Sequence, residues 1–249
     1  MKTSYNAYCK EREPTGTPER IPQKYKRLEE VFTMKKGLTE VVFILDRSGS
    51  MGGLESDTIG GFNAMLEKQR KAEGEALINT VLFDSESRVL HDRVPVDKVQ
   101  DLTDEDYTVG GCTALLDAVG DAVHHIETVH KYIREEDRPE KTLFVITTDG
   151  MENASRRYTP ERVKKLISAK QEDGWEFLFL GANIDAVGTA REMGIREEHS
   201  VNYHCDRKGT RLNFQVMADT IAEVRATGVV RKGWKKRIDE DYETRESER

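Results

Sequence analysis

Residues 41–50 read VVFILDRSGS, a run of five apolar residues that ends in a short polar segment. A continuous apolar run of this length is typical of a strand that is buried on both faces of a parallel sheet. Similar runs recur along the chain, and most are separated by enough residues for a crossover helix. The candidate core strands are residues 40–45, 77–83, 142–147, 176–180 and 200–203.

A shorter strand is expected at residues 88–91, so close to the strand ending at Phe83 that the two should form an antiparallel hairpin. Apolar side chains at helical spacing predict helices near residues 115–133 and 214–224. Capping residues bracket two more predicted helices, at residues 159–174 and 185–194. The pattern predicts an α/β fold, with a doubly wound, Rossmann-like, mostly parallel central sheet, one antiparallel edge strand and helices on both faces.

Length and composition favour one domain with extensions. A chain of 249 residues, of which 37% are hydrophobic and 34% charged, can bury one α/β core beneath a highly charged surface. Residues 1–36 hold three of the six prolines and are expected to form a basic, extended arm with a possible helix at residues 23–33. Residues 37–228 should form the domain, and residues 229–249 a charged C-terminal tail.

The sequence predicts neither a membrane segment nor a secretory signal. Its longest apolar runs fall far short of the roughly 18 residues that a spanning helix needs, and the first twenty residues contain no apolar stretch. The cysteines, Cys9, Cys112 and Cys205, are odd in number and lack CxxC spacing, so neither a disulfide framework nor a zinc site is indicated. We therefore expect a cytoplasmic protein with reduced thiols.

The net charge of −7 is unevenly distributed. Residues 1–36 carry +4 and residues 225–249 carry +2, which leaves about −13 on the stretch between them. Because an acidic core repels phosphate backbones, this distribution argues against nucleic acid as the main ligand. The basic cluster at residues 231–237, RKGWKKR, is the one exception, and we interpret it as a solvated tail.

The polar segment after the first strand offers oxygen ligands. Asp46, Ser48 and Ser50 alternate in sequence, so in an extended loop their side chains point the same way. One carboxylate and two hydroxyls suit magnesium, which prefers oxygen ligands, better than zinc. By itself the pattern is weak evidence, because serines after a strand are more often helix caps.

Two later segments strengthen the metal-site interpretation. The sequence GGCTAL at residues 110–115 is a glycine-rich turn that opens a helix and places Thr113 at its tip. The sequence TTDG at residues 147–150 ends another apolar strand in the carboxylate of Asp149. All three segments should meet at the edge of the sheet formed by the carboxyl ends of its strands, where such folds bind ligands.

Together, DRSGS, GGCTAL and TTDG resemble the metal-ion-dependent adhesion site of von Willebrand factor type A domains, over about residues 38–227. Similar domains occur as cytoplasmic proteins of bacteria and phages. The resemblance implies a Mg²⁺ or Mn²⁺ site with Ser48 and Ser50 as direct ligands, Asp46 and Thr113 as direct or water-bridged ligands, and Asp149 as a carboxylate behind them. It also implies a protein partner whose Glu or Asp carboxylate completes the coordination of the metal.

We therefore predict a divalent-metal-dependent protein-interaction module that is not an enzyme. The sequence contains no GxSxG, P-loop or GxGxxG motif. Two alternatives remain open: a metal-dependent hydrolase or phosphatase that uses Asp46, and RNA binding through the basic cluster of the tail.

Other conspicuous side chains are expected to be structural. Cys112 is interpreted as a tightly packed thiol, and Asp117 as a favourable charge in the first turn of a helix. Glu152 and Asn153 are interpreted as polar residues that cap the following segment. The histidines of one predicted helix lie off its apolar stripe and should be exposed: His124, His125 and His130.

Overall fold

The computed structural model describes residues 34–247. The expected N-terminal arm, with its possible helix at residues 23–33, therefore lies almost entirely outside the described residues. Residues 35 and 36 of that arm already belong to the first strand, which begins five residues before its predicted start at residue 40.

A six-stranded sheet has the order β3-β2-β1-β4-β5-β6. All neighbouring strands run parallel except β3, which pairs antiparallel with β2 at the edge. The predicted mostly parallel sheet with one antiparallel edge strand is thus confirmed. The strands are β1 (Lys35–Asp46), β2 (Glu75–Phe83), β3 (Ser87–Pro95), β4 (Pro139–Thr148), β5 (Glu176–Ala182) and β6 (Ser200–Tyr203).

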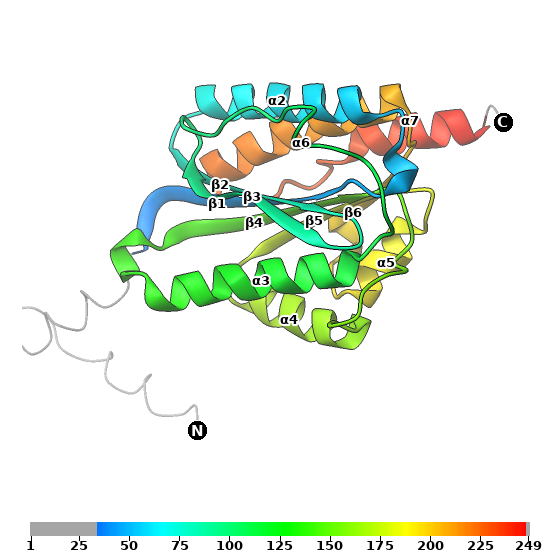
Figure 1. The fold of residues 1–249 in the computed structure, drawn as a ribbon. Coiled ribbons are helices and arrows are strands. Elements are labelled where there is room, and N and C mark those ends of the chain that lie inside the picture. Colours follow the sequence, from blue (N-terminus) through cyan, green and yellow to red (C-terminus); the bar gives the residue numbers. More distant parts are fainter. Residues whose placement is uncertain (1–33, 248–249) are drawn as a thin grey trace, which may run out of the picture. The chain divides into compact units, whose positions relative to one another are not determined.

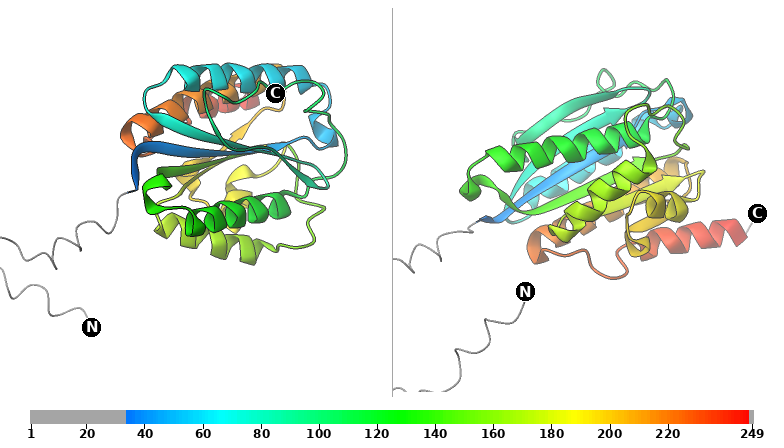
Figure 2. Two further views of the ribbon diagram at one scale, coloured as in Figure 1. Left: turned by 60° about the vertical axis from the view of Figure 1, so that its left-hand side comes forward. Right: turned by 90° about the horizontal axis from the view of Figure 1, so that it is seen from below.

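Helices cover both faces of the sheet, as predicted (Figures 1 and 2). One face carries α2 (Glu55–Lys71), α6 (Arg207–Thr227) and α7 (Lys236–Ser247). The other carries α3 (Leu115–Tyr132), α4 (Pro160–Glu172) and α5 (Ala186–Glu192). Among these described helices, none combines the length and apolar character needed to cross a membrane.

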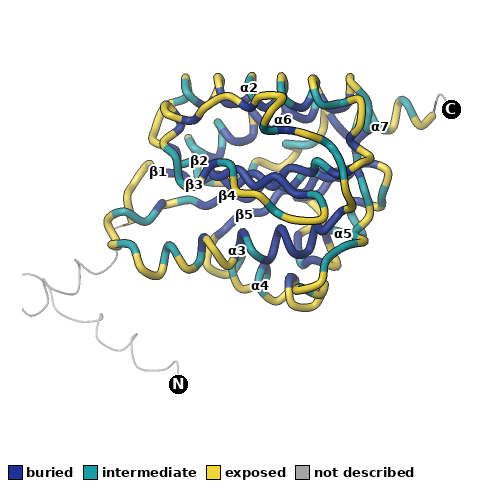
Figure 3. The backbone as a smooth tube through the Cα atoms, in the orientation of Figure 1, coloured by how far each residue is buried: buried dark blue, intermediate teal, exposed yellow. Residues whose placement is uncertain are grey.

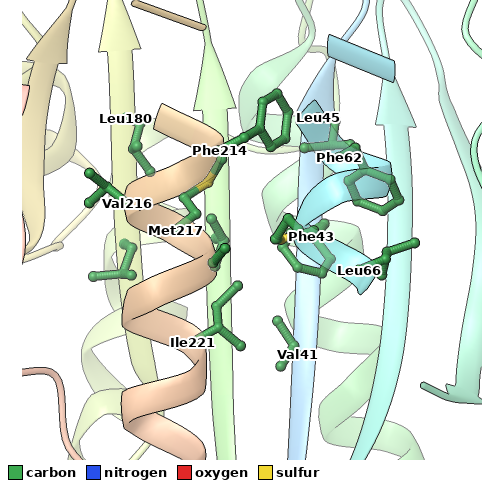
Figure 4. Close-up of a cluster of buried hydrophobic side chains, with 14 of the residues drawn as sticks. Val41, Phe43, Leu45, Phe62, Leu66, Leu180, Phe214, Val216, Met217 and Ile221 are labelled. Carbon is green, nitrogen blue, oxygen red and sulfur yellow. The ribbon is translucent and has the colours of Figure 1, made fainter. Parts of the chain in front are cut away.

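The buried strands lie between two hydrophobic clusters (Figure 3). One cluster joins the sheet to α2 and α6. In it, Phe43 of β1 packs edge to face against Phe62 of α2, with 5.3 Å between the ring centroids (Figure 4). The other cluster joins the opposite face to α3 and α4. Because alternate side chains of β1 enter opposite clusters, both faces of its apolar run are buried.

The sequence pattern did not predict helix α2. Its buried face includes Thr58, Phe62 and Leu66, but Gly60 and Gly61 interrupt the apolar stripe. Gly61 has a packing role, because a Cβ atom there would lie 2.3 Å from the ring of Phe214 on α6. The glycine that obscures the helical pattern is therefore what lets α2 and α6 approach closely.

The end of the chain also differs from expectation. Residues 229–249 were predicted to be a charged tail, yet residues 236–247 form α7, which packs against β6 and α6. Ile238 is only 1% exposed, and Arg245 forms ion pairs with Asp206 and Asp241. A single buried apolar residue in a 12-residue helix gives no stripe that periodicity could detect.

Candidate metal site

The candidate site lies at the carboxyl ends of β1 and β4, which are adjacent parallel strands with Leu45 paired to Thr147. This register brings Asp46 and Asp149 out of the sheet at the same edge. Both are almost completely buried, at 1% and 2% exposure. The fold thus places two carboxylates from distant parts of the sequence in one polar site.

Hydroxyl groups from two loops lie at Asp149 and the adjacent Gly150. The Ser50 hydroxyl donates to Asp149 Oδ1 at 2.6 Å, and Ser48 Oγ lies 3.1 Å from Ser50 Oγ. Thr113 lies close to Ser50, at the space beside Gly150. A Cβ atom at this glycine would lie 3.0 Å from Thr113 Oγ1 and 3.4 Å from Ser50 Oγ. The hydroxyls of Ser50 and Thr113 therefore both lie beside Gly150, next to the carboxylate of Asp149 that Ser50 contacts.

The Asp46 carboxylate accepts one hydrogen bond from its own loop and one from β4. Oδ1 accepts the Ser48 N–H at 2.7 Å, and Oδ2 accepts the hydroxyl of Thr148 at 2.6 Å. Burial raises the pKa of Asp46; these hydrogen bonds oppose the effect, and the charge of Asp149 reinforces it. The neighbouring Arg47 pairs with Asp84 at 2.9 Å instead. Two buried carboxylates thus share a site into which Arg47 brings no positive charge.

The loop that carries Thr113 is joined to the Asp46–Ser50 loop by the backbone. Gly110 N–H donates to Arg47 O at 2.9 Å, and Gly49 N–H donates to Gly111 O at 3.1 Å. Thr113 N–H donates to Asn153 Oδ1 at 2.9 Å. The loops that follow β1, β3 and β4 are therefore hydrogen-bonded to one another around the site.

The segment after Asp149 is shaped by two structural carboxylates. Glu152 accepts backbone N–H bonds from Leu116, Ala154 and Ser155, which confirms its predicted capping role. Asp117 also has a structural role, but it stabilises the loop before α4 and not the end of its own helix. Its carboxylate accepts hydrogen bonds from the backbone N–H groups of residues 156, 157 and 158.

Three residues that contact the predicted ligands were not assigned to the site from the sequence. Thr148 lies within the quoted TTDG motif, so its position was a signal that could have been used. Tyr107 donates its hydroxyl to Asp46 O, and the Cys205 thiol donates to Asp149 Oδ2 at 3.3 Å. Burial raises the pKa of Cys205, and Asp149 reinforces this, so the thiol keeps its proton.

Two expectations for nearby residues were wrong. Cys112 is exposed rather than tightly packed, because it lies with Gly111 in an exposed turn. His130 was expected on the surface, but its side chain is 14% exposed and its Nε2 lies 2.6 Å from Glu40 Oε2, a fully buried carboxylate that also pairs with Arg93. The other two histidines of α3 are exposed as predicted: His124 and His125.

The basic cluster at residues 231–237 does not form a free tail. Trp234 Nε1 donates to Glu198 O, and Lys235 donates to Ser200 O at 2.7 Å. Arg237 pairs with Asp219 at 3.2 Å. Much of this cluster therefore binds the body of the domain, and its capacity for phosphate groups is reduced accordingly.

In residues 34–247, no group of three or more His, Cys, Asp or Glu side chains is placed to hold a metal. The candidate site is of another kind, because its oxygen atoms come from two carboxylates and three hydroxyls. Such a set fits a hard cation that retains water ligands.

No family model matches this chain, and no curated protein matches its sequence. Solved structures do match it. The vWF domain of the type V pili tip protein Mfa5 from Porphyromonas gingivalis is 12% identical, with a TM-score of 0.55, over 78% of this chain and 96% of that domain. A von Willebrand factor type A protein from Catenulispora acidiphila is 16% identical, with a TM-score of 0.52, over 75% of this chain and 42% of its own.

The mussel byssus provides a third similar structure, proximal thread matrix protein 1 with a zinc-occupied MIDAS motif. It is 16% identical, with a TM-score of 0.52, and the match covers 75% of this chain and 46% of that protein. This chain thus spans less than half of the mussel and Catenulispora proteins. At these identities the matches establish the fold: residues 34–247 adopt the von Willebrand factor type A fold.

Proposed function

We propose that this chain is a divalent-metal-dependent protein-interaction module, in which Asp46, Ser48, Ser50, Thr113 and Asp149 hold Mg²⁺ or Mn²⁺. The observation that carries the proposal is that the Ser50 hydroxyl donates to the buried carboxylate of Asp149, while the Thr113 hydroxyl, from a separate loop, lies beside the next residue, Gly150. A hydroxyl cluster of this kind has no evident value for packing, and its oxygens would coordinate a hard cation.

The charge of the site supports a cation. Asp46 and Asp149 are both buried, and burial of carboxylates is costly unless a positive charge accompanies them. When bound, the ion would supply that charge and an electrophilic centre for an incoming oxygen ligand. The chain's own residues orient the site: Thr148 and the Ser48 amide fix the Asp46 carboxylate, and Asn153 fixes the backbone of Thr113.

The choice of Mg²⁺ or Mn²⁺ rests on the donor atoms. All five proposed residues offer oxygen, which these ions prefer, whereas zinc is usually bound by nitrogen and sulfur. The mussel protein of the same fold holds zinc in its MIDAS motif, so zinc belongs in any titration. The sulfur atom of Cys205 lies 3.3 Å from Asp149 Oδ2, and its thiol proton is donated to that carboxylate.

A protein partner with an exposed Glu or Asp side chain fits the site best. Ser50 and Met151 are exposed at its rim, the latter at 71%, so a partner can reach the metal position from solvent. The domain carries excess negative charge and would repel a carboxylate in the absence of the ion. Similar structures include a pili tip protein, which is compatible with a non-enzymatic, protein-binding role.

The hydrolase alternative has less support. The Asp46 carboxylate is 1% exposed, so a bulky phosphoester has little access to it as a nucleophile. We also retain the proposed cytoplasmic location, with which the free thiols of Cys112 and Cys205 are compatible.

The proposal is tested by capturing the partner in Mg²⁺ and in chelator, with wild type and with Thr113→Ala. We expect wild type to retain the partner only in Mg²⁺ and the variant to lose most of it, because Thr113 contributes a ligand from a loop and no core packing. Replacing the recognised partner Glu or Asp by the corresponding amide should also abolish binding. Equal capture by both proteins in both buffers would contradict the proposal.

A further inference from the structure

Tyr107 is a buried side chain that contacts the backbone of Asp46 at the candidate site. It lies in the long connection between β3 and α3, six residues before Thr113, and it is 1% exposed. Its ring belongs to the hydrophobic cluster between the sheet and α2, together with Leu102. A residue chosen only to fill that cluster would need no hydroxyl group.

The hydroxyl of Tyr107 donates to the backbone oxygen of Asp46. That oxygen belongs to the last residue of β1, at the point where the strand becomes the ligand loop. Burial raises the pKa of Tyr107 well above its ordinary value, and the charge of Asp46 adds to this, so the phenol remains a donor. The Tyr107 hydroxyl is thus a buried donor directed at the start of the ligand loop.

The same segment makes two further bonds to the ligand loop. Gly110 N–H donates to Arg47 O, and Gly49 N–H donates to Gly111 O. Residues 107–111 are thus joined to residues 46–49 at three successive points, and Thr113 follows directly. Of these three bonds, the one from Tyr107 is made by a side chain, so it can be removed by substitution without altering the backbone.

We infer that Tyr107 is a positioning residue for the metal site: its hydroxyl fixes the Asp46–Ser50 loop relative to the loop that carries Thr113. The inference rests on the proposed function, since it concerns how the two loops that carry the proposed ligands are held together. A residue behind the ligands that orients them in this way typically changes metal affinity by about 10- to 100-fold when it is removed.

The test compares Tyr107→Phe with a control that weakens the same segment elsewhere. Asn63 on α2 holds the Leu102 peptide through both its N–H and its C=O, at 2.8 and 2.9 Å, and has no bond to the ligand loop. Asn63→Ala should therefore lower stability and leave the Tyr107 hydroxyl in place. Mn²⁺ affinity is measured by calorimetry for wild type and both variants, well below their melting temperatures.

We expect Tyr107→Phe to weaken Mn²⁺ binding by roughly tenfold, at the low end of effects seen for such residues, and Asn63→Ala to change it little. Amide hydrogen exchange at residues 46–53 of the metal-free protein should be faster in Tyr107→Phe than in wild type. Unchanged Mn²⁺ affinity in Tyr107→Phe, or an equal loss in Asn63→Ala, would overturn the inference.

The exchange measurement separates this inference from the proposed function. If wild type binds no Mn²⁺ but Tyr107→Phe still exchanges faster at residues 46–53, the metal assignment fails while Tyr107 is shown to fix the loop. If wild type binds Mn²⁺ and the variant matches it in both affinity and exchange, the metal site stands and the role of Tyr107 is refuted.

Discussion

Thr113 and Cys112 are adjacent residues with opposite environments. Thr113 is 3% exposed, and its hydroxyl lies beside Ser50 and Gly150, whereas Cys112 is exposed to solvent. Thr113→Ala should weaken Mn²⁺ binding by about 10-fold or more, because one oxygen ligand or its bridging water is lost. Cys112→Ala serves as the matched control and should bind as wild type does. Calorimetric titration of both variants checks this, and an equal loss in both would mean that the loop backbone, and not the hydroxyl, is what matters.

The lowered pKa of Asp117 should make the stability of the protein depend on pH. Burial opposes its ionisation, but backbone hydrogen bonds from residues 156, 157 and 158 outweigh burial, so its pKa is lowered. A carboxylate with a lower pKa in the folded state stabilises the protein above the unfolded value of about 3.9, and this contribution is lost as the pH falls through the folded pKa. Asp117→Asn should cost about 1–3 kcal/mol at neutral pH.

Urea unfolding of wild type and Asp117→Asn between pH 3 and pH 7 measures this effect. The difference in the free energy of unfolding should be largest at pH 7 and should shrink toward acid, since protonated Asp117 already lacks the charge that attracts the three N–H groups. A difference that is independent of pH would show that the carboxylate acts by shape alone.

The proposed metal ligands were predictable because they follow recognisable strands at fixed spacing. Asp46, Ser48 and Ser50 come directly after an apolar run, and Asp149 ends another. Tyr107 and Cys205 were not predictable in the same way. Each reaches the site only because the chain folds back, and a single tyrosine or cysteine in a loop carries no periodic signal.

At the scale of elements, α2 offers two neighbouring glycines with opposite surroundings. A Cβ atom at Gly61 would lie 2.3 Å from the Phe214 ring, whereas a Cβ atom at Gly60 would meet nothing within 4 Å. Gly61→Ala should therefore destabilise the protein by about 1–3 kcal/mol through overpacking. Gly60→Ala should stabilise it by about 0.5–1 kcal/mol, because alanine favours the helix.

Denaturant unfolding of the two variants tests the packing of α2 on α6. If both alanines stabilise the protein, the helices must be farther apart than described. The same pair explains why α2 was missed. Sequence patterns identified α3, α4 and α6 from their apolar stripes and caps, but two glycines in the first half of α2 lower its apparent helical propensity.

Helix α7 makes a second prediction at this scale. Ile238 is 1% exposed and is the buried apolar residue through which the helix joins the domain. Ile238→Ala should lower the free energy of unfolding by about 2–5 kcal/mol, because it leaves a cavity. Glu243→Ala, an exposed position on the same helix, should change it by less than about 0.5 kcal/mol. If both variants unfold as wild type does, α7 contributes nothing to the stability of the domain.

For the whole molecule, the fold class and the layer order followed from the alternation of apolar runs and amphipathic helices. The contribution of α7 did not, because it is held by ion pairs such as Lys208–Asp241 and by one isoleucine. Charged contacts between distant residues leave no trace in a local pattern. The same is true of the buried Glu40, whose partners Asn79, Arg93 and His130 come from three other elements.

The whole fold also explains where a metal would bind. The order of the sheet brings β1 and β4 together at its centre, so loops about 100 residues apart in the sequence meet at one edge. Hydroxyls and carboxylates gather there beneath an exposed rim, while the rest of the domain carries excess negative charge. A bound divalent ion would make this rim locally positive, which is the basis of the proposed recognition.

The most direct test is a crystal structure grown with Mn²⁺, in which anomalous scattering locates the ion. We expect one strong peak within coordination distance, about 2–2.3 Å, of the oxygens of Ser48, Ser50 or Thr113. The peak should be absent from crystals of Asp46→Ala grown in the same solution. A wild-type structure without a peak at these residues, or with its peak at Cys205 and His204 instead, would contradict a metal site at Asp46, Ser48, Ser50, Thr113 and Asp149.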